Sequence, residues 1–353
     1  MRGYGMLGLD KPGWIEKPAP VAGPMDAIIR PIAIAPCSSD THTLHSQAGA
    51  GQEGLILGHE AVGEITSVGE LVHDFKPGDV VIVPCVTPDW EAKQLQRQGV
   101  GNAHDRGLMG SFKFLLQQDG TFAEFFKVNN ADANLVHMPD DVSIEDALMT
   151  VDMMSTAFHG VELADVQFGD TVVVFGIGPV GLMAVAGAAL RGAGRIVGIG
   201  TRPNCIELAR EYGATDIVSY KEGDVVEQIK GLVGAADECI IAGGNAGTLN
   251  QALALTRPGG TISSVNFYDG AETFEINAWE WGLGMSDVSI RCGFCTGGAY
   301  RIEQLLNVIR AGRVHPGKML NYVYEGFDKI EDAFKVMDEK PRDLIKPIVH
   351  IKW

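Results

Sequence analysis

A cysteine and a histidine near the start of the chain have neighbours that suit metal chemistry. Cys37 lies in the run Cys37-Ser38-Ser39-Asp40-Thr41-His42, and His59 lies in Gly58-His59-Glu60-Ala61-Val62-Gly63. A thiolate and an imidazole are two of the three protein ligands that a catalytic zinc ion needs, and such a site leaves its fourth position open. Either residue alone would indicate only a packed side chain. Together they predict a catalytic metal site.

A glycine-rich turn later in the chain has the spacing of a dinucleotide-binding loop. Gly176-Ile177-Gly178-Pro179-Val180-Gly181 follows an apolar run over 171–175 and begins a helical pattern that continues to Leu190. The first glycine permits a tight turn, the second lets a pyrophosphate approach the backbone, and the third allows helix and strand to pack closely. The helix N-terminus supplies amide donors for phosphates. The bare motif is weak evidence, but its strand–turn–helix context predicts a dinucleotide site.

The residues after the next strand indicate which dinucleotide is bound. NAD-binding proteins usually carry an acid there, which accepts hydrogen bonds from the adenosine ribose. This chain has Gly200-Thr201-Arg202. The glycine leaves room, the threonine can donate a hydrogen bond, and the guanidinium suits a phosphate. The pattern favours NADP over NAD, although Arg202 read alone is also compatible with a solvated surface charge.

The elements that must position these residues fall into two patterns. Residues 27–36 and 60–85 are rich in short apolar runs broken by turn residues, which predicts a β-rich first part. A helix is expected from residue 144, with Ser143 as its N-cap. From residue 169 onward strands and helices alternate, which predicts a doubly wound parallel sheet. The expected strands there are 171–175, 195–199, 216–218, 238–241 and 261–265, and the expected later elements are helices 300–311 and 328–339 and strand 347–351.

Composition excludes several classes of protein. The chain has 353 residues, a formal net charge of −17 and 46% hydrophobic residues. A surface this acidic repels phosphate backbones, so we expect no nucleic-acid partner. No stretch of eighteen apolar residues occurs, so we expect no membrane span and a cytoplasmic protein. The six cysteines are too sparse for a disulfide scaffold. Cys292-Gly293-Phe294-Cys295 could be redox-active or hold half a metal site, but packing is the favoured interpretation.

These motifs together resemble those of the zinc-dependent medium-chain alcohol dehydrogenases, and the resemblance covers almost the whole chain. More narrowly the chain is similar to the NADP-dependent secondary-alcohol dehydrogenases of anaerobic bacteria and protists. The runs that carry the narrower resemblance are Gly13-Trp14-Ile15-Glu16-Lys17, Thr87-Pro88-Asp89-Trp90, Phe158-His159-Gly160 and Lys340-Pro341-Arg342-Asp343-Leu344-Ile345-Lys346. The family fold implies a GroES-like β-rich catalytic domain over 1–152 and 297–353, with a Rossmann domain over 153–296.

The resemblance also implies roles for individual residues. Asp152 would be the third zinc ligand, and Glu60 would ligate at rest or act from the second shell. Ser39 and His42 would form a proton path. Tyr220 and Lys340 would lie near the adenosine end of NADP, and Val265-Asn266-Phe267 would follow the cofactor toward its nicotinamide.

The resemblance implies one catalytic zinc, reversible hydride transfer between a short secondary alcohol and NADP, and a homotetramer. Many relatives hold a second, structural zinc with four closely spaced cysteines, but no cysteine occurs here between Cys85 and Cys205. Two departures fall near the expected substrate pocket: Phe112 stands where relatives often have tryptophan, and the loop 97–106 does not match. Rival interpretations are a polyol or amino-alcohol dehydrogenase, a zinc-free quinone or enone reductase, and a cofactor-binding protein without enzymatic activity.

Overall fold

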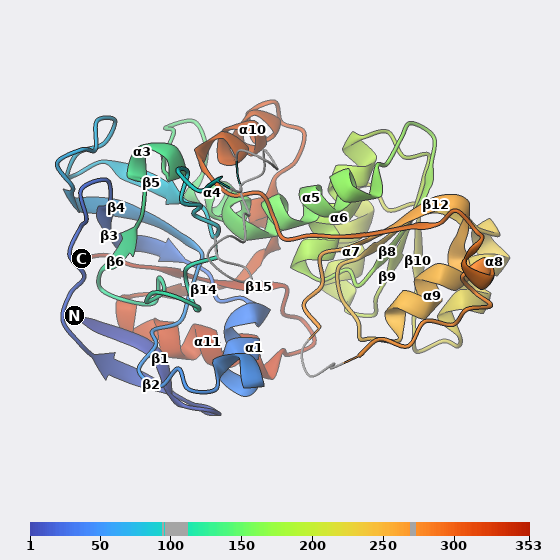
Figure 1. The fold of residues 1–353 in the computed structure, drawn as a ribbon, viewed down its shortest axis with the longest axis horizontal. Helices are drawn as coiled ribbons and strands as arrows, with labels where there is room; N and C mark the ends of the chain where they lie inside the picture. Colours follow the sequence, from blue (N-terminus) through green and yellow to red (C-terminus); the bar gives the residue numbers. More distant parts are fainter. Residues whose placement is uncertain (94, 96–111, 269–272) are drawn as a thin grey trace. The chain divides into compact units, whose positions relative to one another are not determined.

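The structure is a computed structural model, and it describes residues 1–93, 95, 112–268 and 273–353. The chain forms two compact units, both drawn in Figure 1. The first unit combines Met1–Ser155 with Thr296–Trp353, and the second is the continuous stretch Thr156–Cys295. No helix in the described stretches is long and apolar enough to cross a membrane.

A mostly antiparallel sheet forms the centre of the first unit. β3 (Ala27–Ile34) pairs with β4 (Ala61–Val68), with Ile34 opposite Ala61. The late strand β15 (Lys346–His350), red in Figure 1, pairs antiparallel with β3. The other strands are β14 (Leu320–Glu325), β5 (Val80–Val83), β6 (Phe126–Val128) and β7 (Val136–His137). Because β3 ends opposite the start of β4, residues just after Ile34 and just before Ala61 meet at one edge of the sheet.

A hairpin that the sequence analysis did not predict precedes this sheet. β1 (Arg2–Gly8) pairs antiparallel with β2 (Lys11–Glu16). Its glycines weaken the strand pattern in the sequence but are required by packing. A Cβ on Gly5 would lie 2.1 Å from the carbonyl oxygen of Leu55. The missing side chain therefore allows the hairpin to approach the backbone beneath it.

The helices of the first unit lie mostly where the sequence patterns predicted them. The two late helices are α10 (Ala299–Arg310) and α11 (Ile330–Glu339), which differ from the predicted ranges by one or two residues. Two short helices, α1 (Ser38–His45) and α3 (Ala131–Asn134), were not predicted.

The predicted helix at residue 144 contains an irregular turn. α4 (Ile144–Met149) begins after Ser143, whose Oγ accepts a hydrogen bond from Asp146 N at 3.1 Å. A π-helical turn, Thr150–Met154, follows directly and leads into α5 (Ser155–Ala164). The N-cap prediction is confirmed, whereas the π-helical turn was not foreseen. Such turns inside helices frequently occur at functional sites.

The second unit is the predicted parallel sheet. Its strands are β8 (Thr171–Phe175), β9 (Arg195–Ile199), β10 (Asp216–Val218), β11 (Ala236–Ile241), β12 (Thr256–Ser264) and β13 (Ser289–Cys292). They lie in the order β10-β9-β8-β11-β12-β13, which is the order of a dinucleotide-binding fold. The connecting helices are α6 (Pro179–Leu190), α7 (Pro203–Glu211), α8 (Val225–Val233) and α9 (Thr248–Leu255). β12 begins five residues earlier than predicted, and β13 was missed.

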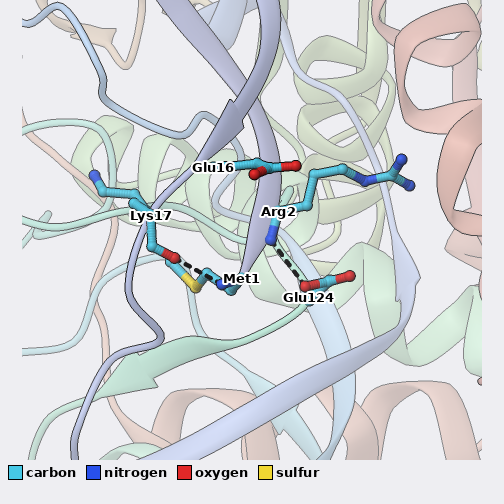
Figure 2. Close-up of a pocket in the computed structure, with 5 residues that line it drawn as sticks. All are labelled: Met1, Arg2, Glu16, Lys17 and Glu124. Atoms are coloured by element: carbon cyan, nitrogen blue, oxygen red, sulfur yellow. Dashed lines mark hydrogen bonds between the residues drawn. The ribbon is translucent and has the colours of Figure 1, made fainter.

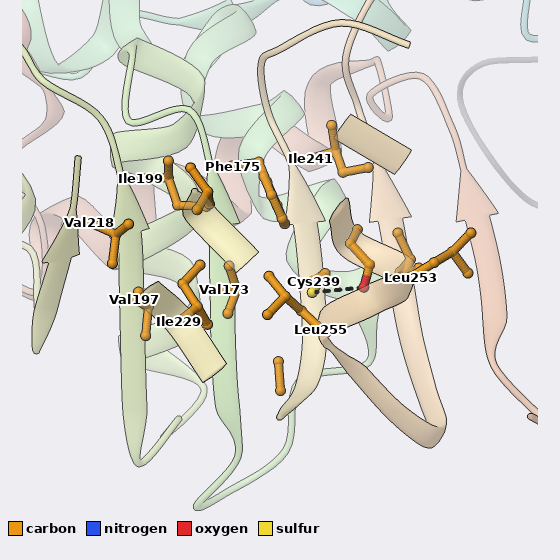
Figure 3. Packing of buried hydrophobic residues seen from close by; sticks show 14 residues of the cluster. Val173, Phe175, Val197, Ile199, Val218, Ile229, Cys239, Ile241, Leu253 and Leu255 are labelled. Carbon is orange, nitrogen blue, oxygen red and sulfur yellow. Dashed lines mark hydrogen bonds between the residues drawn. The ribbon is translucent and has the colours of Figure 1, made fainter. Parts of the chain in front are cut away.

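The core of the second unit explains why its strands are continuous apolar runs in the sequence. Alternate residues such as Val173 and Phe175 face one buried cluster, in which Ile229 of α8 and Leu253 of α9 also pack (Figure 3). The intervening Val172 and Val174 are also fully buried. Both faces of the sheet are therefore covered, as parallel sheets require.

Candidate metal and dinucleotide sites

Four side chains converge where β3 ends and β4 begins. Cys37, His59, Glu60 and Asp152 each offer one ligand atom, and these atoms all lie within 4.8 Å of one another. Asp152 Oδ2 lies 3.6 Å from Cys37 Sγ and 3.3 Å from His59 Nε2. A sulfur, an imidazole nitrogen and carboxylate oxygens are the donors that zinc accepts in proteins.

Asp152 reaches this cluster from the π-helical turn. The carbonyl of its neighbour Val151 accepts a hydrogen bond from Cys85 N at 3.2 Å, which ties the turn to the chain after β5. The residues next to Asp152 contain no pattern that predicts a metal ligand. Only the family resemblance predicted Asp152 as a zinc ligand.

Asp40, which the sequence analysis did not single out, fixes the orientation of His59. It is fully buried, and its Oδ1 lies 3.1 Å from His59 Nδ1 and accepts from Gly58 N at 3.0 Å. Its Oδ2 accepts from Cys37 N at 2.8 Å. A carboxylate against one ring nitrogen directs the other nitrogen toward a metal. Asp40 stands three residues after the N-cap Cys37, and this capping-box spacing was the available signal.

The electrostatics of the cluster fit a bound cation. Burial lowers the pKa of His59, but the carboxylates of Asp40 and Asp152 raise it by more, so the pKa lies well above its ordinary value. Burial raises the pKa of Glu60 to about 7, against the lowering effect of Lys346. Glu60 Oε2 is buried without a hydrogen-bond partner. A divalent cation would compensate the clustered anions, and Glu60 Oε1 lies 3.8 Å from His59 Nε2, so the residues fit zinc.

Lys346, at the start of β15, is a second residue to which the sequence analysis gave no role. Its Nζ donates to Glu60 Oε1 at 2.7 Å and to the Pro36 carbonyl at 3.0 Å. Its side chain is 1% exposed. Burial lowers its pKa, but Glu60 and Cys37 raise it by more, so the amine stays protonated. No local pattern could indicate this contact, because 286 residues separate Lys346 from Glu60.

Ser39 and His42, the residues of the expected proton path, both lie on α1. Ser39 Oγ is 3.3 Å from His59 Nε2, so the hydroxyl lies directly beside the metal cluster. His42 is partly buried and follows three residues later. Residues with this spacing lie on the same side of a helix.

Phe112 covers one side of the cluster. Its ring centroid lies 5.3 Å from that of His59, and the two rings are nearly perpendicular. Its side chain is 6% exposed. The neighbouring loop 97–106, which departs from the family pattern, lies outside the described residues.

In the second unit the glycine-rich loop has the geometry expected of a phosphate-binding turn. Gly176 has φ +86°, a backbone conformation that side chains disfavour, and Gly178 is the N-cap of α6, with Pro179 at its first position. A Cβ on Gly181 would lie 1.7 Å from the Gly176 carbonyl oxygen. Ile177 N donates to Ile199 O at 3.1 Å, which joins the loop to β9.

The residues expected to select NADP surround this loop. A Cβ on Gly178 would lie 3.4 Å from an Arg202 guanidinium nitrogen, so the arginine reaches the start of α6. Thr201 Oγ1 donates to the Tyr220 hydroxyl at 2.9 Å, and Tyr220 is exposed. Gly200 is buried against Ile177, with no room for a side chain. Arg202 thus lies near the start of α6, and Tyr220 is joined to the neighbouring loop through Thr201.

The other expected cofactor residues are found in two places. Val265, Asn266 and Phe267 follow β12, and Val265 N donates to Ile241 O at 3.1 Å. Asn266 Nδ2 is buried without a hydrogen-bond partner, which suits a residue that binds a ligand. Lys340 belongs to the first unit, where it ends α11 with φ +47°. Val180 lies in the first turn of α6.

A cavity of about 650 Å³ lies away from all these residues, beside the first hairpin (Figure 2). Its polar groups bind one another: the amino group of Met1 donates to the Lys17 carbonyl, and Arg2 N donates to Glu124. Lys17 forms an ion pair with Asp119. These contacts hold the groups of Met1, Arg2, Lys17 and Glu124 in place, and nothing at this cavity indicates a catalytic or binding role.

All six cysteines are unpaired by disulfides. Cys292 ends β13 and is exposed, whereas Cys295 is buried. Nothing observed at Cys292 and Cys295 indicates that the two cysteines form a redox centre.

Comparison with known proteins agrees with this arrangement. Residues 23–140 match the model of the alcohol dehydrogenase GroES-like domain, and residues 179–311 match that of zinc-binding dehydrogenases. The NADP-dependent isopropanol dehydrogenase of Thermoanaerobacter brockii is 51% identical, over 99% of each chain. That of Entamoeba histolytica is 49% identical, over 100% of this chain and 96% of the relative.

A solved structure extends the likeness to the whole fold. The alcohol dehydrogenase TADH from Thermus sp. ATN1 has a TM-score of 0.85 and 28% identity, with all of both chains covered. The expected combination of a GroES-like domain and a Rossmann domain is thereby confirmed. The chain belongs to the zinc-dependent medium-chain alcohol dehydrogenase family.

Proposed function

We propose that this protein is an NADP-dependent zinc alcohol dehydrogenase that interconverts short secondary alcohols and their ketones. The observation that carries the proposal is the buried cluster of Cys37, His59, Glu60 and Asp152 in a chain about half identical to isopropanol dehydrogenases. A zinc-free reductase of the same fold would have no use for these four ligands together. A protein without enzymatic activity would not need the proton-transfer groups beside them.

The roles of the residues follow from their positions. Cys37, His59 and Asp152 hold zinc, with Asp40 orienting His59. Zinc bound there would supply Lewis-acid polarisation of the substrate oxygen, and bound NADP would supply the hydride acceptor. Phe112 excludes water from one side of the cluster and limits the bulk of the substrate.

Ser39 accepts the hydroxyl proton of the alcohol and passes it toward His42. Its Oγ is adjacent to the metal-binding atom of His59, where the substrate hydroxyl would lie. A buried site needs such a path, because water cannot collect the proton directly. His42 lies one helical turn further along α1, is likewise partly buried, and completes the path.

NADP is selected by the groups around the first turn of α6. Gly200 lacks the acid that would repel a 2′-phosphate, and the approach of Arg202 to Gly178 and the bond between Thr201 and Tyr220 support binding of that phosphate. By the family resemblance, Val265-Asn266-Phe267 would bind toward the nicotinamide end of the cofactor and Lys340 toward its adenosine end. A polyol dehydrogenase that prefers NAD would retain an acid at position 200.

The active protein holds one zinc per chain and forms a homotetramer. A structural zinc of the family type needs four closely spaced cysteines, and the sequence has none between Cys85 and Cys205. Trp279, Leu283 and Met285 of the second unit are each more than half exposed. Large apolar side chains grouped in one segment favour contact between subunits, and light scattering would measure the assembly.

A substrate panel tests the proposal. Propan-2-ol and butan-2-ol with NADP should be oxidised faster than ethanol, and both should exceed sorbitol and threonine. NAD should be the poorer coenzyme for every substrate. Faster oxidation of sorbitol or threonine would favour the polyol or amino-alcohol alternative, and active protein without metal would exclude the zinc mechanism.

A further inference from the structure

Lys346 places a buried positive charge next to the candidate metal ligands. Its Nζ lies 2.7 Å from Glu60 Oε1 and 3.0 Å from the carbonyl of Pro36, the residue before Cys37. The side chains of Lys346 and Glu60 are 1% and 0% exposed. A buried lysine is costly unless it is paired and hydrogen-bonded. The chain retains this one where a hydrophobic residue would pack without that cost.

The two oxygens of Glu60 have different surroundings. Oε1 accepts the hydrogen bond from Lys346, whereas Oε2 is buried and has no hydrogen-bond partner. Oε1 also lies 3.8 Å from His59 Nε2, so the oxygen that accepts from Lys346 is also one that approaches the metal-binding nitrogen of His59. Lys346 and a metal ion in the cluster would therefore compete for the same carboxylate oxygen.

The backbone of Lys346 is also fixed. Asn321 Oδ1 accepts from Ile345 N at 2.8 Å and from Lys346 N at 3.3 Å. β15 continues from Lys346 and pairs with β3, the strand that leads to Cys37. The backbone of Lys346 is therefore anchored, and its amine is held between Glu60 Oε1 and the Pro36 carbonyl.

We propose that Lys346 is a positioning residue that keeps Glu60 from becoming a permanent zinc ligand. By binding Oε1, it withdraws negative charge from the carboxylate and limits how far Glu60 can move toward the metal. Glu60 then contacts the ion weakly and reversibly, and the fourth ligand position stays open to substrate. This inference rests on the proposed zinc-dependent function.

The central experiment removes the charge with Lys346→Met and measures the metal without substrate. We expect Glu60 to bind the ion firmly in this variant, so zinc release to a chelator should slow by roughly tenfold or more, the scale on which outer-shell groups act. After replacement of zinc by Co²⁺, the visible absorption spectrum of the variant should differ from that of the wild type. kcat should fall while KM for NADP stays unchanged. Faster zinc release would overturn the proposal.

A double-mutant cycle separates this role from simple packing. In a Glu60→Gln background, Lys346→Met should change neither zinc release nor the Co²⁺ spectrum, because the restrained carboxylate is already gone. Lys346→Arg, which keeps the charge, should restore a spectrum like that of the wild type. Lys352→Met is the matched control, since Lys352 is 90% exposed and far along the same segment. If the Lys346→Met effect persisted without Glu60, the inference would be wrong.

A variant that leaves Lys346 in place covers the case in which Lys346→Met does not fold. Glu60→Gln alone should release zinc within about threefold of the wild-type rate, well below the effect of losing a full ligand or its support. Zinc release a hundredfold faster than in the wild type would show that Glu60 is already a full ligand.

A different result would contradict the proposed function itself, namely wild-type protein that contains no zinc. Active zinc protein with unaltered Lys346→Met kinetics and spectrum would contradict this inference alone.

Discussion

Ile177 fills the space that a side chain on residue 200 would need. A Cβ added to Gly200 would lie 2.3 Å from Ile177 Cγ1, far inside van der Waals contact. Ile177, between the first two glycines of the loop, and Gly200, directly after β9, are therefore matched in side-chain size. Any acid introduced at position 200 has a steric effect as well as an electrostatic one.

A pair of variants separates these two effects. Gly200→Ala should weaken the use of NADPH and NADH alike, because Ile177 must move. Gly200→Asp should further weaken NADPH by repelling the 2′-phosphate, and the ratio of kcat/KM values for NADPH and NADH should fall about tenfold or more between the two variants, which is about 1.4 kcal/mol. Equal ratios in the two variants would place the 2′-phosphate elsewhere.

Arg202→Ala should reduce NADPH binding without affecting NADH. Loss of a hydrogen bond to a charged group costs about 1.5–3 kcal/mol, so NADPH affinity should fall roughly ten- to hundredfold. Titration calorimetry with both coenzymes measures the difference. Arg210→Ala, in the last turn of α7, is a control that should change neither affinity.

Ser39→Ala should lower turnover and leave metal binding intact. Proton transfer by a positioned group typically contributes about 10²–10⁴-fold to a rate. Zinc content and NADPH affinity should remain normal, because the hydroxyl only transfers a proton. Ser38→Ala on the same turn is the control. Unchanged turnover in Ser39→Ala would assign the proton path to Thr41 or water.

Asp40→Asn should weaken zinc binding without touching a ligand. The carboxylate holds His59, Cys37 N and Gly58 N together, and an amide cannot accept at both positions. The expected loss is about 10–100-fold in metal affinity. Asp132→Asn is a control, since Asp132 also accepts from two backbone amides, of His73 and Asp74, but is not in contact with the metal cluster.

The second unit contains a carboxyl group that should make its stability fall as pH rises. Burial, with Asp170 and Asp237 nearby, raises the pKa of Glu238 to about 8. The folded state therefore holds a proton that the unfolded chain releases above its ordinary pKa of 4.5. The contribution of Glu238 to the free energy of unfolding is fully present below pH 4.5. It is lost as pH rises toward about 8, by at most about 1.4 kcal/mol per pH unit.

Glu238→Gln tests this dependence. The variant should lose less stability than the wild type between pH 6 and about 8, the part of the window away from acid loss of zinc. Chemical denaturation at several pH values measures the free energy of unfolding. Parallel pH profiles for the two proteins would show that Glu238 does not hold the proton.

Local patterns were sufficient for part of the site. Cys37, His59 and the loop from Gly176 were found because each lies in a short motif whose spacing reflects one turn or one strand–helix junction. Asp152 depends on a π-helical turn, and Lys346 on pairing between β15 and β3. Neither has a signature in neighbouring residues, since both arise from contacts between distant segments. The first hairpin was missed for a related reason: its glycines serve a close packing contact, not the strand itself.

The pairing of β15 with β3 also bears on how the protein is made. The second unit is continuous, whereas the first is completed by a strand that follows it in the chain. Domains fold as units during synthesis, beginning from the N-terminus. The inserted unit can therefore reach its final structure on the ribosome, while β3, which pairs with β4, still lacks β15 on its other side. Lys346 reaches Glu60 only at the end, so the metal centre acquires its final charge balance after the cofactor domain has been synthesised.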